Sequence, residues 1–314
     1  MNLKVWGPFE TIKNHIILQT SSGNFLLSTG SPMTIIKDGV TLGFLEKYFS
    51  ITRNFKNTSR NLSGRMLSEI SDFIGTSIDG LIGTDYLMDI DVSIDPLSET
   101  FIFCPPVDKR PADFKGVMTD LEIYNSIPVV NLLYNGVEHR AFLDTGSCIS
   151  YINESLIKGT QPVKKNIPDY LPMYGRFETD IYNLKIALAS VELNMNFGVL
   201  PSRLACALND TGIDFIIGVD ILKNFAMHLS LSGKFIVLNK IELEPEGSAK
   251  RWIQKFNATP SYHLINNISL ESIKDDFIGN DEIVKAIEER MLWLGEGSTR
   301  EHLKKLLRRV KWEE

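Results

Sequence analysis

The stretch that decides the fold is Ala-Phe-Leu-Asp-Thr-Gly-Ser at residues 141–147. The apolar residues Ala-Phe-Leu, which are typical of a buried strand, lead directly into Asp-Thr-Gly. A second short apolar run that ends in glycine, Phe-Ile-Ile-Gly-Val-Asp-Ile-Leu, follows at residues 215–222. Either motif alone says little, because Asp-Thr-Gly occurs by chance at many turns. Both motifs together, in this order and at this spacing, form a specific pattern.

This pair of motifs resembles the two signatures of the aspartic peptidase superfamily, pepsin-like and retropepsin-like. The resemblance implies that Asp144 is a catalytic carboxylate. It also implies that the Ile-Ile-Gly run crosses behind the loop that carries Asp144 and fixes it. Thr145, Gly146 and Ser147 are then the residues that support this loop.

The same two motifs occur a second time, near the N-terminus. Leu-Ser-Thr-Gly-Ser at residues 27–31 matches Leu-Asp-Thr-Gly-Ser at 143–147, and Leu-Ile-Gly-Thr-Asp-Tyr-Leu at 81–87 matches Ile-Ile-Gly-Val-Asp-Ile-Leu at 216–222. The first motifs stand 116 residues apart (144 minus 28). An internal repeat of this length predicts two lobes of roughly retropepsin size, fused into a pseudo-dimer as in bilobal pepsins.

One difference between the copies dominates the functional question, because Ser28 stands where the family has aspartate. The family mechanism uses two close carboxylates that share one proton, so that one acts as the acid and the other as the base. A serine hydroxyl can donate a hydrogen bond to a carboxylate but cannot replace its charge. Without an acidic partner, Asp144 is expected to titrate near the ordinary aspartate pKa of about 3.9.

The rest of the first motif is intact. Thr29 and Gly30 remain beside Ser28. In the family this threonine reaches across to its counterpart, here Thr145, and ties the two loops together. The resemblance therefore implies that the architecture of the paired loops is kept although one carboxylate is not.

The predicted fold class is mainly β, with two retropepsin-like β-barrel lobes in a pepsin-like pseudo-dimer and a helical extension after them. The expected domains are a degenerate N-terminal lobe at residues 1–110, a C-terminal lobe at 111–245 and the extension at 246–314. Hairpins are predicted at 15–28 and 127–143, the latter around Asn-Gly at 135–136, a strong hairpin signal. After residue 245 the apolar period changes to three or four, which predicts helices over 281–294 and from residue 298 onwards.

Two further segments are expected beside the cleft. In the family, the polar and basic residues 53–71 would carry the flap hairpin that closes over substrate, although the composition also fits a solvated loop. Residues 160–180, rich in Pro, Tyr and Gly, would line the cleft or lie beside it. Tyr170 and Tyr174 are candidates for stacking on a bound peptide, and ordinary packing is the alternative for both.

Charge, apolar patterning and cysteine and histidine spacing limit the partners, location and cofactors that we expect. The 314 residues carry a net charge of -6, which argues against nucleic acid or anionic membranes as partners. The apolar runs are too short to span a bilayer and the N-terminus lacks a secretory pattern, so a cytoplasmic location is expected. The three cysteines and five histidines show no metal-ligand spacing, so we expect neither a metal nor a cofactor.

Three hypotheses follow for the function, each with a peptide or protein as the partner. In the first, two Asp144 residues meet in a homodimer, which is not favoured because the tethered first lobe already occupies that face. In the second, an aspartic endopeptidase uses Asp144 with Ser28 and a water. In the third, a pseudo-peptidase holds an extended peptide in the cleft without cutting it. The retention of the full motif around Asp144 favours the second hypothesis.

Overall fold

The computed structural model describes residues 5–42, 60–107, 114–171, 174–259 and 261–311. The chain divides into two compact units. The β unit comprises Met1–Ile94 and Phe101–Lys240, and the helical unit comprises Asp95–Thr100 and Ile241–Glu314. The lobe and extension boundaries expected at residues 110 and 245 stay predictions.

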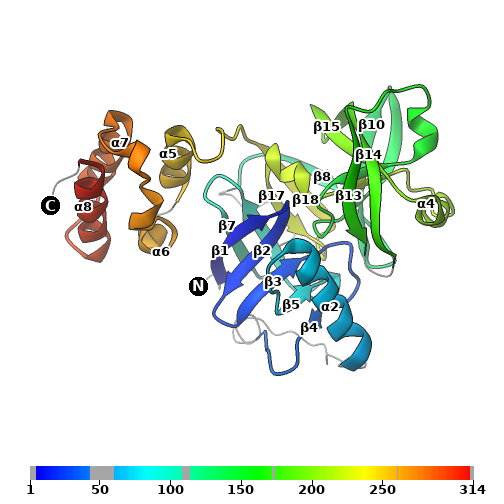
Figure 1. Cartoon of the computed structure of the whole chain (residues 1–314), viewed down its shortest axis with the longest axis horizontal. Helices are drawn as coiled ribbons and strands as arrows, with labels where there is room; N and C mark the ends of the chain where they lie inside the picture. The colour runs from blue at the N-terminus through cyan, green and yellow to red at the C-terminus, as the bar shows by residue number, and fades with distance from the viewer. Residues whose placement is uncertain (1–4, 43–59, 108–113, 172–173, 260, 312–314) are drawn as a thin grey trace. The chain divides into compact units, whose positions relative to one another are not determined.

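Two sheets form the β unit (Figure 1). The first is ordered β4 (Ile35–Ile36), β5 (Gly80–Ile82), β3 (Gly23–Leu27), β2 (His15–Thr20), β1 (Val5–Ile12), β7 (Thr100–Cys104), β6 (Asp91–Asp95), β17 (Phe225–Ser230), β18 (Phe235–Lys240) and β8 (Val117–Asp120). The second is ordered β13 (Lys164–Leu171), β14 (Gly175–Leu188), β15 (Val191–Val199), β12 (Ser150–Ile152), β16 (Phe215–Ile217), β11 (Val137–Leu143), β10 (Ile127–Tyr134) and β9 (Glu122–Tyr124).

The described helices are fewer in the β unit than in the helical unit. In the β unit they are α2 (Arg60–Ile74), α3 (Thr84–Leu87), η1 (Glu154–Ile157), α4 (Ser202–Asn209) and η2 (Val219–Lys223). In the helical unit they are α5 (Ala249–Ala258), η3 (Ser261–His263), α6 (Leu264–Asn267), η4 (Leu270–Ser272), η5 (Asp275–Phe277), α7 (Asp281–Leu292) and α8 (Ser298–Lys311). The prediction of a mainly β fold followed by C-terminal helices is confirmed.

The hairpins that lead into both motif loops form where the sequence predicts them. β2 pairs with β3, and β10 pairs with β11 along almost their whole length. Asn135 and Gly136 both have positive φ, at 50° and 78°, which is the backbone that a tight two-residue hairpin turn requires. Local turn chemistry therefore determines how each loop is presented.

Equivalent strands of the two repeats join in the first sheet. β6 pairs antiparallel with β17, with Ser93 opposite His228. These two residues differ by 135 positions (228 minus 93), as do Ile82 and Ile217 of the second motifs (217 minus 82). Ser93 and His228, which face each other in this strand pair, are therefore equivalent positions of the two repeats. The two repeats also share a single buried core that contains residues of both.

The flap expected at residues 53–71 is wrong for the part that the structure describes, because residues 60–71 belong to α2. Residues 53–59 lie outside the described residues. Leu67, Ile70 and Ile74 recur at helical spacing and are buried against the face of the first repeat that Ile17, Leu26, Ile35 and Leu81 line. Helix α2 ends six positions before β5, and α4 ends six positions before β16 (80 minus 74, 215 minus 209), so α4 is the counterpart of α2 in the second repeat. The second repeat also has a β13–β14 hairpin, and its Tyr170 contacts Glu69 of α2.

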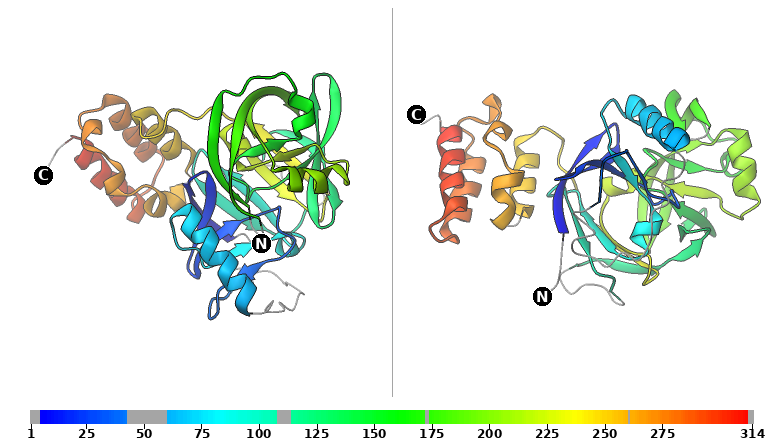
Figure 2. Two further views of the ribbon diagram at one scale, coloured as in Figure 1. Left: turned by 45° about the vertical axis from the view of Figure 1, so that its right-hand side comes forward. Right: turned by 90° about the horizontal axis from the view of Figure 1, so that it is seen from below.

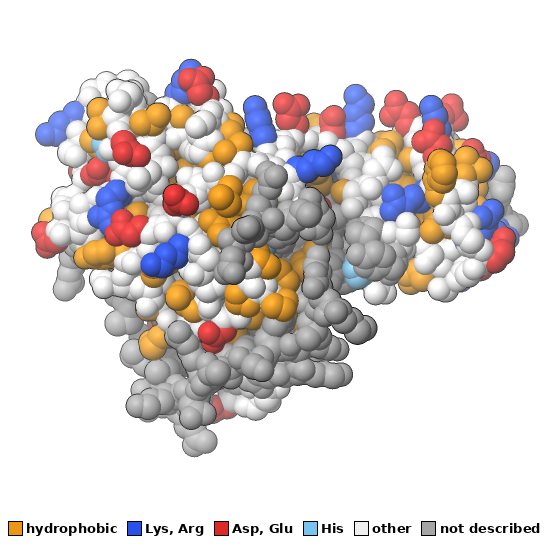
Figure 3. Space-filling model, turned by 180° about the vertical axis from the view of Figure 1, so that it is seen from behind, with side chains coloured by type: hydrophobic (Ala, Val, Ile, Leu, Met, Phe, Trp, Pro, Cys, Tyr) orange, Lys and Arg blue, Asp and Glu red, His pale blue; other side chains and the backbone are white. Residues whose placement is uncertain are grey.

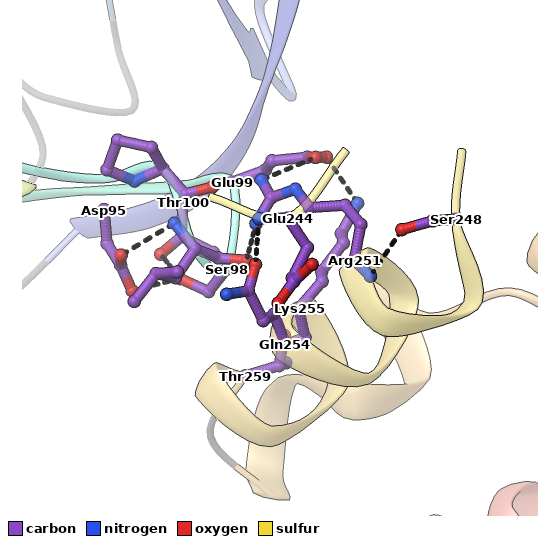
Figure 4. Close-up of polar contacts among 12 residues, drawn as sticks. Asp95, Ser98, Glu99, Thr100, Glu244, Ser248, Arg251, Gln254, Lys255 and Thr259 are labelled. Atoms are coloured by element: carbon purple, nitrogen blue, oxygen red, sulfur yellow. Dashed lines mark hydrogen bonds and ion pairs between the residues drawn. The ribbon is translucent and has the colours of Figure 1, made fainter. Parts of the chain in front are cut away.

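The helical unit has its own core, and its helices gather around it (Figure 2). Trp252 and Phe256 stack in that core with ring centroids 5.0 Å apart. Within the same unit, Arg251 donates to the carbonyl of Leu97 at 3.3 Å and Lys255 pairs with Glu99 at 2.5 Å (Figure 4). Figure 3 shows described lysine and arginine side chains interleaved with acidic ones on one face of the molecule.

Among the described residues, no helix combines the length and the apolar character needed to cross a membrane.

Candidate active site

Each motif loop begins where a strand ends beside a parallel strand. β3 runs parallel to β5 in the first repeat, and β11 runs parallel to β16 in the second. The backbone N–H of Ser28 donates to the carbonyl of Ile82 at 3.0 Å, and that of Asp144 donates to the carbonyl of Ile217 at 2.8 Å. The apolar-apolar-Gly run of each repeat therefore anchors the first residue of its loop.

An aspartate and a hydroxyl group brace each loop from behind. The Thr34 hydroxyl donates to Asp85 at 2.6 Å in the first repeat, and the Ser150 hydroxyl donates to Asp220 at 2.6 Å in the second. The same hydroxyl oxygen accepts the N–H of the second-motif glycine, at 2.9 Å and 3.0 Å respectively. The two repeats thus share one hydrogen-bonded support for their loops.

These supporting residues were not predicted from the sequence, although a signal was present. Thr34 and Ser150 each stand six positions after the first residue of their loop (34 minus 28, 150 minus 144). Asp85 and Asp220 each stand two positions after the glycine of the second motif. Comparing the repeats position by position, beyond the signature residues, would have found both pairs.

The two loops are tied together by their threonines. The Thr29 hydroxyl donates to the carbonyl of Leu143 at 2.5 Å and accepts the N–H of Thr145 at 2.9 Å. The Thr145 hydroxyl donates to the carbonyl of Leu27 at 3.0 Å and accepts the N–H of Thr29 at 3.1 Å. Both threonines are fully buried. Four hydrogen bonds, related by exchange of the repeats, therefore connect the ends of β3 and β11.

Ser28 and Asp144 face each other across this connection. The Ser28 hydroxyl lies 3.5 Å from Oδ1 of Asp144. The same oxygen accepts the backbone N–H of Gly30 at 3.1 Å and that of Gly146 at 2.9 Å. Three donors, two from the loop of the first repeat and one from the loop of the second, thus converge on one carboxylate oxygen.

The glycines are required by this close approach. A Cβ on Gly30 would lie 2.2 Å from the carboxylate carbon of Asp144, and a Cβ on Gly146 would lie 2.3 Å from the Ser28 oxygen. Both distances are far below van der Waals contact. Each glycine therefore makes room for the side chain of the opposite repeat.

The expectation of an ordinary pKa for Asp144 is wrong, because the pKa is raised. Burial raises the pKa of Asp144, because removal from water disfavours the charged carboxylate. Hydrogen bonds from the backbone N–H groups of Gly146 and Gly30, from the Ser28 hydroxyl and from the Ser147 backbone oppose this effect. Burial can thus raise the pKa of a carboxyl group without a second acid beside it.

Ser147 supports the loop mainly through its backbone. Its N–H donates to the carbonyl of Asp144 at 3.1 Å, and its own carbonyl accepts the N–H of Val219 at 2.9 Å. Its hydroxyl donates to the carbonyl of Ile149 at 3.0 Å. Ser31 of the first repeat makes the corresponding hydroxyl contact, with the carbonyl of Met33 at 2.7 Å.

Burial also raises the pKa of Asp220, to about 6. The hydrogen bond from Ser150 and the charge of Lys223 oppose the shift but are smaller than the effect of burial. Asp220, which braces the Asp144 loop, can therefore gain or lose its proton near pH 6.

The two tyrosines expected in the cleft have different surroundings. Tyr170 lies on β13, where its hydroxyl donates to Glu69 at 2.8 Å and its ring stacks on Phe73 at 5.6 Å. Tyr174 is exposed and meets Phe177 edge-on, with ring centroids 5.8 Å apart. Tyr170 thus packs on α2 of the first repeat, and peptide stacking by either residue stays a prediction.

Asp169, which the sequence analysis did not single out, connects β13 to the Asp144 loop. It is buried, and its carboxylate accepts hydrogen bonds from the thiol of Cys148 at 3.2 Å and from the hydroxyl of Tyr151. Burial, followed by the charge and hydrogen bond of Asp169, raises the pKa of the Cys148 thiol. Cys148 is therefore a poor nucleophile in this arrangement.

Among the described residues, no three His, Cys, Asp or Glu side chains are grouped so that they could hold a metal ion. The expectations of no metal and no cofactor stay predictions.

Neither a protein-family model nor a curated protein matches the chain in sequence. Solved structures with a similar fold include the aspartic proteinase from Irpex lacteus, which is 14% identical over 76% of this chain and 97% of that protein, with a TM-score of 0.42. The Simian Foamy Virus (mac) protease is 13% identical over 29% of this chain and 86% of its own, with a TM-score of 0.22. The EIAV protease in complex with the inhibitor HBY-793 is 18% identical over 31% of this chain and 86% of its own, with a TM-score of 0.24.

Proposed function

We propose that this protein is an aspartic endopeptidase of the pepsin-like and retropepsin-like superfamily that acts on an extended peptide segment between its two repeats. The single observation that carries the proposal is the opposition of Ser28 and Asp144, 3.5 Å apart, within a hydrogen-bonded framework that both repeats share. Because the first repeat already occupies the face opposite Asp144, no homodimer is needed to build the site.

In the proposed mechanism Asp144 serves first as the base and then as the acid. The ionised carboxylate takes a proton from water while the water oxygen bonds to the scissile carbonyl carbon. The Ser28 hydroxyl, together with the N–H groups of Gly30 and Gly146, holds the carboxylate in position. As the C–N bond breaks, the protonated Asp144 returns its proton to the leaving amine. The raised pKa supports this second role, because it makes protonation of Asp144 easier.

The absence of a second carboxylate sets the expected rate. A positioned acid or base contributes about 100- to 10,000-fold to a rate, so this site is expected to be slower than a two-carboxylate site by a factor in that range. Cleavage of an unselective peptide library, followed by mass spectrometry between pH 3 and 8, tests the proposal. Asp144→Asn is expected to abolish all cleavage, whereas Ser28→Ala is expected to slow it.

The alternative is a pseudo-peptidase that binds a peptide segment without hydrolysing it. The replacement of one acid by Ser28 favours this function, because strand-like binding through the backbone needs no carboxylate pair. Peptides that bind and are recovered intact from both the wild type and Asp144→Asn would support it. Cleavage that persists in Asp144→Asn would contradict both functions as stated.

A further inference from the structure

We infer that the pocket beneath helix α4 of the second repeat is a binding site for a small neutral molecule with a branched aliphatic group and a carboxamide group. The pocket lies between α4 and the strands β12 and β16. Most of its lining side chains are apolar, and a few are polar, which is the usual composition of a small-molecule site. The inference does not depend on the proposed function.

The segment before β16 is equivalent, residue by residue, to the segment before β5. The backbone N–H of Lys37 donates to the carbonyl of Asp79 at 2.9 Å, and the N–H of Asn153 donates to the carbonyl of Asp214 at 2.8 Å. Asp79 and Asp214 stand 135 positions apart (214 minus 79), the same shift that relates the second motifs. A shift of 135 positions therefore also relates the residues of α2 to those of α4.

This shift explains why a pocket exists under α4. Ile70 and Ile74 of α2 are buried against the sheet of the first repeat. Their equivalents in α4 are Ala205 and Asn209 (205 minus 70, 209 minus 74), and both of these line the pocket. The second repeat therefore lacks two isoleucine side chains that the first repeat buries at the same place. A branched aliphatic group has the shape that fits this space.

Helix α4 is held less firmly than α2. None of the described side chains of α4 is buried. Leu208 is partly buried and packs against a small cluster that contains Phe142 and Ile213. A helix with few buried apolar contacts opens locally at a low cost in free energy. Helix α4 can therefore move outward and admit a ligand while the sheet beneath it stays folded.

The polar residues of the lining indicate the polar group of the ligand. The side-chain amide of Asn153 donates to Oδ1 of Asn209 at 2.5 Å, which leaves the amide nitrogen of Asn209 to donate to a ligand carbonyl. The Asp214 carboxylate, which His139 contacts at 2.8 Å, can accept an N–H of the ligand. A carboxamide supplies both groups. A ligand carboxylate would place its charge beside that of Asp214 and is disfavoured.

The pocket is separate from the candidate active site, because its lining includes neither Ser28 nor Asp144. It does include Phe215 and Ile216, which directly precede the Ile217 carbonyl that accepts the N–H of Asp144. Binding in the pocket and cleavage at the active site can therefore be measured independently.

The experiment is a titration of the full-length protein with isobutyramide, followed by NMR of isoleucine δ1-methyl groups labelled with ¹³C. The assigned signals of Ile152, Ile213 and Ile216, which line the pocket, are expected to shift and to saturate. Ile78, the equivalent of Ile213 in the first repeat, is the internal control and should not shift. Acetamide and isobutyrate should bind about tenfold more weakly, because one has less apolar surface and the other is charged.

Variants of α4 locate the binding. Ala205→Ile introduces the residue of α2 and is expected to weaken isobutyramide binding about tenfold or more, because it fills the pocket. Cys206→Ile is the matched control, since it adds the same side chain at the next position, which is exposed and does not line the pocket, and its affinity should equal that of the parent. Asn209→Ala removes the donor to the ligand carbonyl and should weaken binding about fivefold.

Two results would overturn the inference: no saturable shift at the three pocket isoleucines of the parent, or equal affinities of the parent and a folded Ala205→Ile. Circular dichroism checks folding. If Ala205→Ile fails to fold, equal affinities of the parent and Asn209→Ala overturn the inference instead.

Asp144→Asn separates this inference from the proposed function, because it should stop cleavage and leave the titration unchanged. Binding of isobutyramide by a protein that cuts no peptide would retain the pocket site and lose the peptidase. Cleavage without binding would do the reverse.

Discussion

The two repeats agree in their framework and differ in their chemistry. In each, a parallel strand anchors the first residue of the loop, an aspartate and a hydroxyl group brace it, and a threonine crosses to the other repeat. Yet Ser28 stands opposite Asp144, and the helix before the second motif has 15 residues in the first repeat (α2) and 8 in the second (α4). The comparison teaches that the contacts holding the loops together do not require a carboxylate in both loops.

The largest expected effect comes from making the repeats chemically equal. Ser28→Asp places a second carboxylate beside Asp144, where two like charges cannot both ionise and one proton is shared. We expect the cleavage rate to rise by about 100-fold or more, because a positioned acid is restored. Peptide cleavage by Ser28→Asp and by Ser28→Asn, which adds no acid, measures the effect. A rate no higher than that of Ser28→Asn would show that the framework no longer positions a working pair.

Replacing Thr29 and Thr145 one at a time tests whether their hydrogen bonds stabilise the two loops equally. Thr29→Val leaves the carbonyl of Leu143 and the N–H of Thr145 without their partners, and Thr145→Val does the same to Leu27 and Thr29. Each variant is expected to lose about 4 kcal/mol of unfolding free energy, since each leaves two buried backbone groups unsatisfied. Urea unfolding measures both. Strongly unequal losses would break the comparison.

The pH dependence of stability sharpens the comparison for the second repeat. Asp220 has a folded-state pKa of about 6 against an ordinary value of 3.8, so the folded state holds its proton more tightly than the unfolded state. Its contribution to stability is therefore fully present below the unfolded pKa and is lost as the pH rises through the folded pKa. At about 1.4 kcal/mol for each pKa unit, the loss approaches 3 kcal/mol.

Asp220→Asn should remove this decline between about pH 4 and 6, since the amide does not titrate. Urea unfolding at several pH values checks it, with Asp210→Asn on the surface as the control for loss of a charge. A decline of the same size in Asp220→Asn would assign the effect to other groups. Because burial also raises the pKa of Asp144, part of the decline is expected to remain in Asp220→Asn.

The smallest expected effect distinguishes the two loop glycines. Gly30→Ala forces a methyl group against the Asp144 carboxylate, which three donors hold in place, and should cost about 2–3 kcal/mol of unfolding free energy. Gly146→Ala meets the Ser28 oxygen at 2.3 Å, which a change of rotamer can move, and the Ser28 Cβ at 2.8 Å, which it cannot, and should cost about 1–2 kcal/mol. Thermal unfolding of both variants measures the difference, and a larger loss for Gly146→Ala would contradict this account.

Several features followed from local sequence alone. The hairpins into both loops formed as predicted, because Asn135 and Gly136 accept the positive φ of a tight turn and the flanking residues alternate. The helices α7 and α8 formed over their apolar stripes. The predicted flap failed over residues 60–71, because Leu67, Ile70 and Ile74 already have helical spacing and the family analogy outweighed that pattern.

The sequence by itself determined that two motifs occur twice, that Ser28 and Asp144 stand at matching positions of the repeat, and which residues form the two loops. These are properties of residue identity and spacing, which a repeat makes visible. The tertiary structure alone decided that the pKa of Asp144 is raised, that Asp220 titrates near 6, and that Tyr170 reaches α2 of the other repeat. Burial and contacts between residues about a hundred positions apart depend on how the whole chain packs, and no local pattern encodes them.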